Sequence, residues 1–243
     1  MQPLSLRTFV TQLPRSALAR DPLATLPGHL HRSGAGLPEL RRTAAELRGD
    51  TEILRTSLRL LTDDIDALTA VANRSYTHPN GFTKIVLHLG GGYGVRLHVW
   101  YAEPPDYGAD TNPHGHRWEF ASWIVVGELR EEIFVEADTG TRHNRFDYSR
   151  RNGRADLHRT GTAALQRVGE IARPAGTVYG RARDKVHTVS PTGRGLVVSL
   201  VLQGPTAFEP TLVYQPQERP AHEETRLTPD RLQVVLHDVQ AAF

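Results

Sequence analysis

Two histidines two residues apart are the side chains of this sequence best suited to chemistry. The segment Asn112-Pro113-His114-Gly115-His116 leads into an apolar run that ends at Val126. On an extended strand, residues i and i+2 project from the same side, so both imidazoles can approach one ion. A third imidazole, His187, precedes another strand-like stretch. Three neutral imidazoles can bind one divalent metal, and the pattern predicts a metal site formed by His114, His116 and His187.

These histidines could also have no role in metal binding. The chain has 12 histidines, and an HxH pair can arise among them by chance or lie on the surface. The elements that would position the three imidazoles therefore matter to the hypothesis.

The middle of the chain predicts a β-structure that could carry these histidines. Short apolar runs, each bounded by Gly, Pro, Asp or Asn, are typical of strands in a barrel or sandwich. They cover residues 82–89, 95–101, 120–126, 131–136, 165–171, 176–179 and 196–203. Asn152-Gly153 predicts a type I′ hairpin turn, because both residues tolerate positive φ. We expect a mainly β fold over residues 79–216.

Both ends of the chain predict helices. Over residues 1–78, apolar residues recur at helical spacing, at Leu4, Phe9 and Leu13 and again at Leu54, Leu58, Leu61, Ile65, Leu68 and Val71. Pro22, Pro27 and the run 33–36 divide this segment into several short helices, and Thr62 is the expected cap of the helix that ends near Asn73. In the tail, residues 217–243, Thr228-Pro229-Asp230 opens an amphipathic helix. The three parts form one structural domain overall.

Composition narrows the class of protein. Among 243 residues, 39% are apolar and 23% are charged, as in globular proteins. The 29 Lys and Arg nearly balance the 27 Asp and Glu, which does not indicate a nucleic-acid partner. The sequence has no cysteine, which excludes disulfides, thiolate metal ligands and a Cys nucleophile. Without an apolar leader we expect a cytoplasmic protein with no membrane contact.

The histidine region resembles the cupin superfamily, whose first motif places a glutamate and a glycine after an HxH pair and whose second carries PxG and a later histidine. His114, His116 and Gly127 match the first motif, and Pro174-Ala175-Gly176 matches the second. The glutamate of the family is missing from its place at Phe120 or Ala121. The nearest acid is Glu119, whose strand parity points it away from the histidines, so its ligation would require a β-bulge.

A cupin with three histidines and no glutamate resembles the thiol dioxygenase branch, typified by cysteine dioxygenase. Phe82-Thr83-Lys84 stands where that branch has Tyr-Thr-Arg, residues 127–131 match its G-x-L-x-E, and the strand from Val198 ends at Gln203 where the branch has a Tyr. The resemblance implies a cupin-type β-barrel (jelly roll), Fe(II), O2 and a small anionic substrate. Lys84 and Gln203 depart from the branch, so cysteine itself is not the expected substrate.

The resemblance and the strand parity together suggest site residues. Lys84, His98 and Gln203 are the candidate catalytic residues, with Lys84 as the cation for the anionic end of the substrate. Strand parity aligns Lys84 with Phe82, Val86 and His88, and the candidate substrate-binding residues are Phe82, Lys84, Arg96, His98, Trp100, Trp118 and Gln203. The loop 103–112 could form a lid, and many cupins are homodimers.

Several alternatives stay open from the sequence. Zn, Ni or Mn suit three histidines as well as Fe(II), and the protein could be a non-oxidative isomerase, lyase or decarboxylase, or a regulatory cupin without turnover. Lys84 could be solvated, His98 could be a satisfied buried residue, and Trp118 could belong to the core.

Overall fold

The computed structural model describes residues 21–78, 80–101, 112–151, 154–206, 210–216 and 224–243. The helices are α3 (Leu26–Ser33), α4 (Leu37–Gly49), α5 (Glu52–Asp63), α6 (Ile65–Ala72) and α7 (Pro229–Ala242). The strands are β1 (Tyr76–His78), β2 (Phe82–Gly90), β3 (Tyr93–Tyr101), β4 (Phe120–Val126), β5 (Glu128–Ala137), β6 (Thr141–Arg151), β7 (Arg154–Pro174), β8 (Val178–Arg181), β9 (Val186–Pro191), β10 (Leu196–Gln203), β11 (Thr211–Gln215) and β12 (Thr225–Arg226). The predictions for Leu4, Phe9 and Leu13, for the turn at 152–153 and for all but the last residue of the lid at 103–112 lie outside the described residues.

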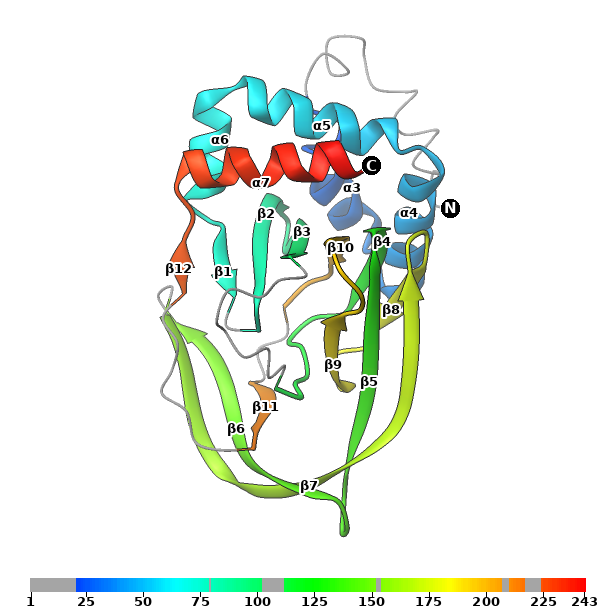
Figure 1. Ribbon diagram of the computed structural model, residues 1–243, viewed down its shortest axis with the longest axis vertical. Coiled ribbons are helices and arrows are strands. Elements are labelled where there is room, and N and C mark those ends of the chain that lie inside the picture. Colours follow the sequence, from blue (N-terminus) through cyan, green and yellow to red (C-terminus); the bar gives the residue numbers. More distant parts are fainter. Residues whose placement is uncertain (1–20, 79, 102–111, 152–153, 207–209, 217–223) are drawn as a thin grey trace.

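The strands form two antiparallel sheets that face each other. One sheet has the order β12-β1-β2-β3-β10-β4-β8 and the other β11-β6-β7-β5-β9. The helices gather at one end of the molecule, and the long strands β5, β6 and β7 curve away toward the other end (Figure 1). The prediction of a mainly β fold with helices at both ends of the chain is confirmed.

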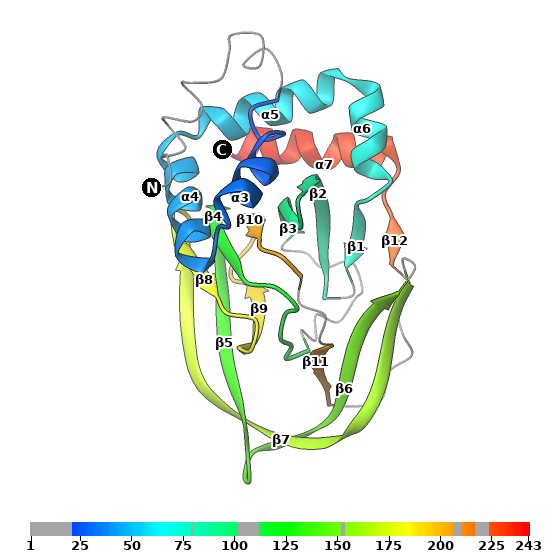
Figure 2. The same ribbon diagram turned by 180° about the vertical axis from the view of Figure 1, so that it is seen from behind.

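The seven-stranded sheet has an outer face toward the helices and an inner face toward the second sheet. Leu97 and Val99 of β3 belong to the large core that also contains the helix residues. Trp100, one position further, packs instead with Leu129 of the second sheet in a smaller, aromatic-rich core. Helices α3, α4 and α7 contact this sheet from the outside (Figure 2). Arg96, His98 and Trp100 therefore share the inner face, because side chains alternate along a strand.

A β-bulge in β2 decides which of its residues face inward. Val86 pairs with Arg96 but His88 pairs with Val95, so Leu87 is an extra residue. The side chain of Arg74 donates hydrogen bonds to the carbonyl oxygens of Val86, at 2.7 Å, and Leu87. These bonds satisfy polar groups that the interrupted ladder leaves unpaired.

Two helix starts show how local chemistry sets the element boundaries. The expected cap at Thr62 is wrong: its hydroxyl donates to the carbonyl of Arg59 inside α5, and Asp64 caps the next helix by accepting from the amides of Asp66 and Ala67. The Asp64 carboxylate accepts from two backbone amides that have no partner within the helix. A new helix therefore begins after Asp64, and α5 and α6 are separate. Thr228 caps α7 as predicted. No helix in the described part of the chain is long and apolar enough to cross a membrane.

Candidate metal centre

The structure brings His114, His116 and His187 together. One ligand atom from each lies within 4.8 Å of the others. The segment with His114 runs beside β9, since His114 and His187 exchange both backbone hydrogen bonds at 3.0 Å. Gly115 allows this approach, because a Cβ at that position would lie 3.2 Å from the carbonyl of Arg183 and 3.1 Å from Thr211 Oγ1. The HxH segment thus forms two isolated bridges through His114, one to β9 and one to β11, and is not part of a longer strand.

Hydrogen bonds at Nδ1 orient two of the three imidazoles. His187 Nδ1 lies 2.8 Å from Glu131 Oε1, and His114 Nδ1 lies 2.9 Å from the carbonyl oxygen of Asn112. Both partners are acceptors, so the hydrogen bonds assign a proton to Nδ1 of each ring. The Nε2 lone pairs of His114 and His187 are then available to a ligand, as in protein metal sites.

Burial keeps the rings of His114 and His116 neutral. Burial, followed by the neighbouring His187, lowers the pKa of His114 to about 4, although its bond to Asn112 acts in the opposite direction. Burial and the two other imidazoles lower the pKa of His116 well below its usual range. Metal ligation requires unprotonated imidazole, so the protein holds both rings in the binding form near pH 7.

The spacing of the nitrogens suits a shared cation. Metal–nitrogen bonds of about 2.1 Å that meet at a right angle separate two nitrogens by about 3.0 Å. The Nε2 atoms of His116 and His187 lie 2.9 Å apart. Three imidazoles from two segments, with ligand atoms within 4.8 Å of one another, are a donor set for a borderline divalent ion such as Fe(II), Zn(II), Ni(II) or Mn(II).

An aromatic ring lies where the cupin resemblance would place a glutamate. The ring of Phe120 lies 4.9 Å from that of His116 and 6.0 Å from that of His187. Trp118 packs on His116 with ring centroids 4.7 Å apart. Glu119 is not in the metal-ligating group found among the described residues. The group consists of imidazoles alone.

A buried ion network behind His187 was missed by the sequence reasoning. Glu131 is fully buried and accepts from His187, Arg173 and Arg181. Burial raises its pKa, but the hydrogen bonds from His187 and Arg181 and the nearby charges outweigh that effect and lower the pKa to about 2. Strand alternation could have indicated that Glu131 is buried, because Glu131 lies on the same face of β5 as the buried Leu129.

The predicted substrate residues lie mostly on the inner face of the seven-stranded sheet. Lys84 pairs with His98, which pairs with Ser199, so these three form one row across β2, β3 and β10. After burial, the charges of Lys84 and Arg96 are the main causes that lower the pKa of His98 well below its usual range. Lys84 also lowers the pKa values of His114 and His116, less strongly than burial and the other imidazoles. The Lys84 charge thus acts on the same interior as the imidazoles.

Other predicted residues complete this face. Gln203 pairs across strands with Phe120, and the ring of Phe82 lies 4.6 Å from His98 and 5.0 Å from Trp100. The guanidinium of Arg96 lies 5.3 Å from the ring of Trp118. In the described part of the chain, the buried atoms on this face that have no hydrogen-bond partner include His98 Nε2, Trp100 Nε1 and Gln203 Oε1. Such atoms are costly unless something binds them.

The alignment of His88 with this face is wrong. The bulge at Leu87 turns His88 to the helix side, opposite Val95, and its Nε2 lies 2.6 Å from Asp21 Oδ2. Val86, which precedes the bulge, pairs with Arg96 as the parity requires.

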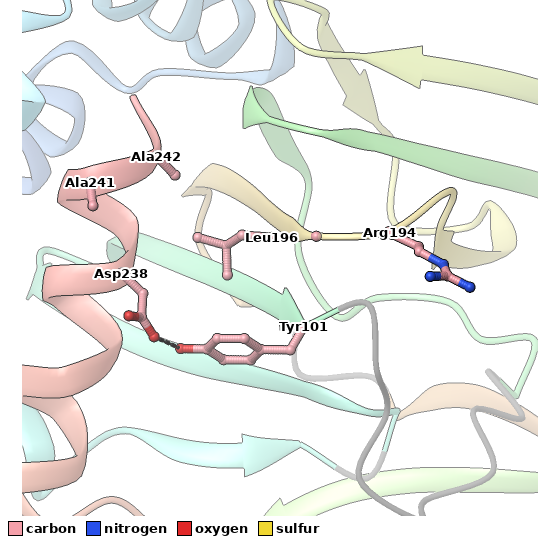
Figure 3. A pocket seen from close by; sticks show the side chains of 7 residues that line it. Tyr101, Arg194, Leu196, Asp238, Ala241 and Ala242 are labelled. Atoms are coloured by element: carbon pink, nitrogen blue, oxygen red, sulfur yellow. Dashed lines mark hydrogen bonds between the residues drawn. The ribbon is translucent and has the colours of Figure 1, made fainter.

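A hollow of about 550 Å³ lies elsewhere, between α7 and the ends of β3 and β10. There Tyr101 donates to Asp238 at 2.8 Å, while Arg194 lies at the opposite end from the helix (Figure 3). None of the predicted site residues lines this hollow.

No protein-family model and no curated protein matches the chain. Among solved structures, it is similar to hydroxypropylphosphonic acid epoxidase from S. wedmorenis, with 10% sequence identity and a TM-score of 0.31 over 51% of this chain and 50% of that one. It is also similar to hydroquinone 1,2-dioxygenase PnpCD, with 16% identity and a TM-score of 0.29 over 51% and 66% of the two chains. A cupin superfamily protein from Desulfitobacterium hafniense DCB-2 has 11% identity and a TM-score of 0.28 over 56% and 87%. This chain therefore spans about half the length of the epoxidase chain that it matches.

Proposed function

We propose that this protein is a non-haem Fe(II)-dependent oxygenase of the cupin type that acts with O2 on a small anionic metabolite. The observation that carries the proposal is the group of three imidazoles, His114, His116 and His187, with Phe120 beside two of them in the place of a carboxylate. Neutral ligands do not offset the charge of a divalent ion, so an anionic substrate is favoured there.

The charge of the surrounding face favours the same kind of substrate. Lys84 and Arg96 project from β2 and β3 toward the interior that holds the imidazoles, and both charges act on His98. Glu131 is the acidic residue beside the site, and two arginines already neutralise it. An anion entering this interior would meet the positive charges of Lys84 and Arg96 at short range, where solvent screens them little.

Polar atoms on this face can orient such a substrate. Trp100 Nε1 is a donor and Gln203 Oε1 an acceptor, and neither has a hydrogen-bond partner. We propose that Lys84 holds the anionic end, while Trp100, Gln203 and the neutral His98 set its direction. A bound Fe(II) would supply the redox chemistry with O2. The aromatic residues Phe82 and Trp118 would limit the access of water to the reacting groups.

Metal analysis combined with oxygen uptake tests the proposal. The protein is purified anaerobically, its metal content is measured, and an oxygen electrode follows consumption with a panel of small carboxylates, thiols and enols. We expect about one iron per chain and oxygen uptake that depends on one class of anion. Turnover with Zn, Ni or Mn and no oxygen uptake would favour a non-oxidative cupin enzyme, and a metal-bound protein without turnover would favour a regulatory one. Absence of bound metal would refute both enzyme hypotheses, the oxygenase and the non-oxidative metal enzyme.

A further inference from the structure

Glu131 lies at a junction of the two sheets, directly behind the metal centre. It belongs to β5, in the five-stranded sheet, as do Arg173 of β7 and His187 of β9. Arg181 reaches it from β8 of the seven-stranded sheet. Its side chain has no exposed surface, so every bond it makes is shielded from water.

The hydrogen bonds to Glu131 use the whole carboxylate. Oε1 accepts from Arg181 Nε at 2.6 Å and from His187 Nδ1 at 2.8 Å. Oε2 accepts from Arg173 Nε at 3.0 Å, from Arg173 Nη2 at 2.7 Å and from Arg181 Nη2 at 2.5 Å. A carboxylate offers about four lone-pair positions, so these five bonds leave none for a metal ion. Glu131 can therefore affect the metal only through His187.

We infer that Glu131 is a positioning residue that fixes the ring orientation and the proton of His187, while Arg173 and Arg181 hold the carboxylate in place. This inference rests on the proposed metal centre. The two oriented imidazoles differ in this respect, because a backbone carbonyl, that of Asn112, holds His114. A carboxylate is the stronger acceptor and raises the basicity of its imidazole more, so His187 is the stronger metal donor of the two.

The two arginines have a separate role from Glu131. Each donates two N–H groups to the carboxylate, so either one can still hold it when the other is removed. Loss of Arg173 would leave the bond between Glu131 and His187 in place. Substitutions at Glu131 and Arg173 therefore distinguish control of His187 from a general contribution of the buried ion pairs to folding.

The test compares Glu131→Gln with Glu132→Gln by using Co(II) as the probe. Co(II) affinity is measured by competition with a chelator, and the absorption spectrum of the bound ion reports on its ligands. Glu132 is the matched control, since it is the next residue on β5 and its partners are the exposed Arg167 and the hydroxyl of Thr188, not an imidazole. We expect Glu131→Gln to weaken Co(II) binding by about 10- to 100-fold and to shift the spectrum, and Glu132→Gln to change neither.

Arg173→Gln separates positioning from stability. It removes a buried ion-pair partner, so we expect a lower melting temperature but a Co(II) spectrum like that of the wild type. Equal losses of affinity in Glu131→Gln and Arg173→Gln, in proportion to their losses of stability, would overturn the inference. If Glu131→Gln does not fold, Glu131→Asp replaces it, because the shorter carboxylate keeps the charge but withdraws from His187. Normal Co(II) binding by the folded Glu131 variant would refute this inference alone, whereas a wild-type protein that binds no Co(II) would refute the metal centre as well.

Discussion

Each of the three imidazoles supplies one ligand atom, so removing one leaves an incomplete site. We expect His187→Ala to lose most of the bound metal, as measured by elemental analysis after dialysis against metal-free buffer, because two protein ligands hold a divalent ion weakly. Glu119→Gln is the matched control and should keep its metal, since Glu119 is outside the ligating group. Full occupancy in His187→Ala would refute the assignment, and loss of metal in Glu119→Gln would restore a four-ligand set.

Lys84 is the side chain on which the substrate proposal depends most. Its ammonium group lies 5.4 Å from the ring of Tyr76 and offers a point charge rather than the planar fork of an arginine. We expect Lys84→Met to weaken binding of the anionic substrate by roughly 1.5–3 kcal/mol, the worth of a hydrogen bond to a charged group, without loss of metal. Steady-state kinetics should show this as a higher KM or as loss of turnover.

Lys185→Met is the control for this variant, because Lys185 is the only other lysine in the chain and is 59% exposed. Unchanged kinetics in Lys84→Met would mean that Lys84 is a solvated or structural residue. In the sequence resemblance, Lys84 stands where the thiol dioxygenases have an arginine. We therefore expect poor turnover of free cysteine. Rapid conversion of cysteine to its sulfinic acid would show that Lys84 and Gln203 do not alter the specificity of the thiol dioxygenase type.

At the scale of elements, the bulge in β2 depends on the side chain of Arg74. Arg74→Met would leave the buried carbonyl groups of Val86 and Leu87 without their donors. We expect it to lower the free energy of unfolding by about 2 kcal/mol, which urea denaturation would measure. Arg59→Met is the control, since Arg59 lies on the exposed side of α5 and bonds there to Thr56. Equal stability of the two variants would show that Arg74 does not stabilise the bulge.

At the scale of the whole molecule, burial of the imidazoles makes the metal-free fold sensitive to acid. The pKa of His114 is about 4 in the fold and 6.5 in the unfolded chain. Between these values the unfolded chain binds a proton that the folded chain does not, so stability falls as the pH falls from 6.5 to 4. We expect a loss of about 2 kcal/mol for His114 alone between pH 7.5 and 5, measured by urea denaturation with a chelator present.

The contribution of Glu131 to the free energy of unfolding does not change between pH 7.5 and 5. Its pKa is lowered from 4.5 to about 2, so the stability that it contributes is complete above pH 4.5 and is lost only as the pH falls toward 2. His114→Phe should therefore make the profile less steep between pH 7.5 and 5, and the remaining slope would come from the buried His116 and His98. A wild-type profile that is already flat there would contradict the burial of neutral imidazoles.

The sequence by itself determined the fold class and the set of three histidines. The strands and helix ends are local signals: strand runs such as 120–126 and 196–203 have the bounds of β4 and β10, and Thr228 caps its helix through a contact three residues away. Spacing and residue type suffice for such features, because the interactions that cause them lie within a few residues of the chain.

Only the tertiary structure decided how these elements face one another. The orientation of His88 depends on Arg74, which reaches across from the end of a helix to a bulge 12 residues away. The partners of Glu131 come from three other strands, 42 to 56 residues along the chain. A one-residue change of register reverses every later side chain, and a buried charge is tolerated only beside its partners, so both features depend on contacts that no local pattern contains.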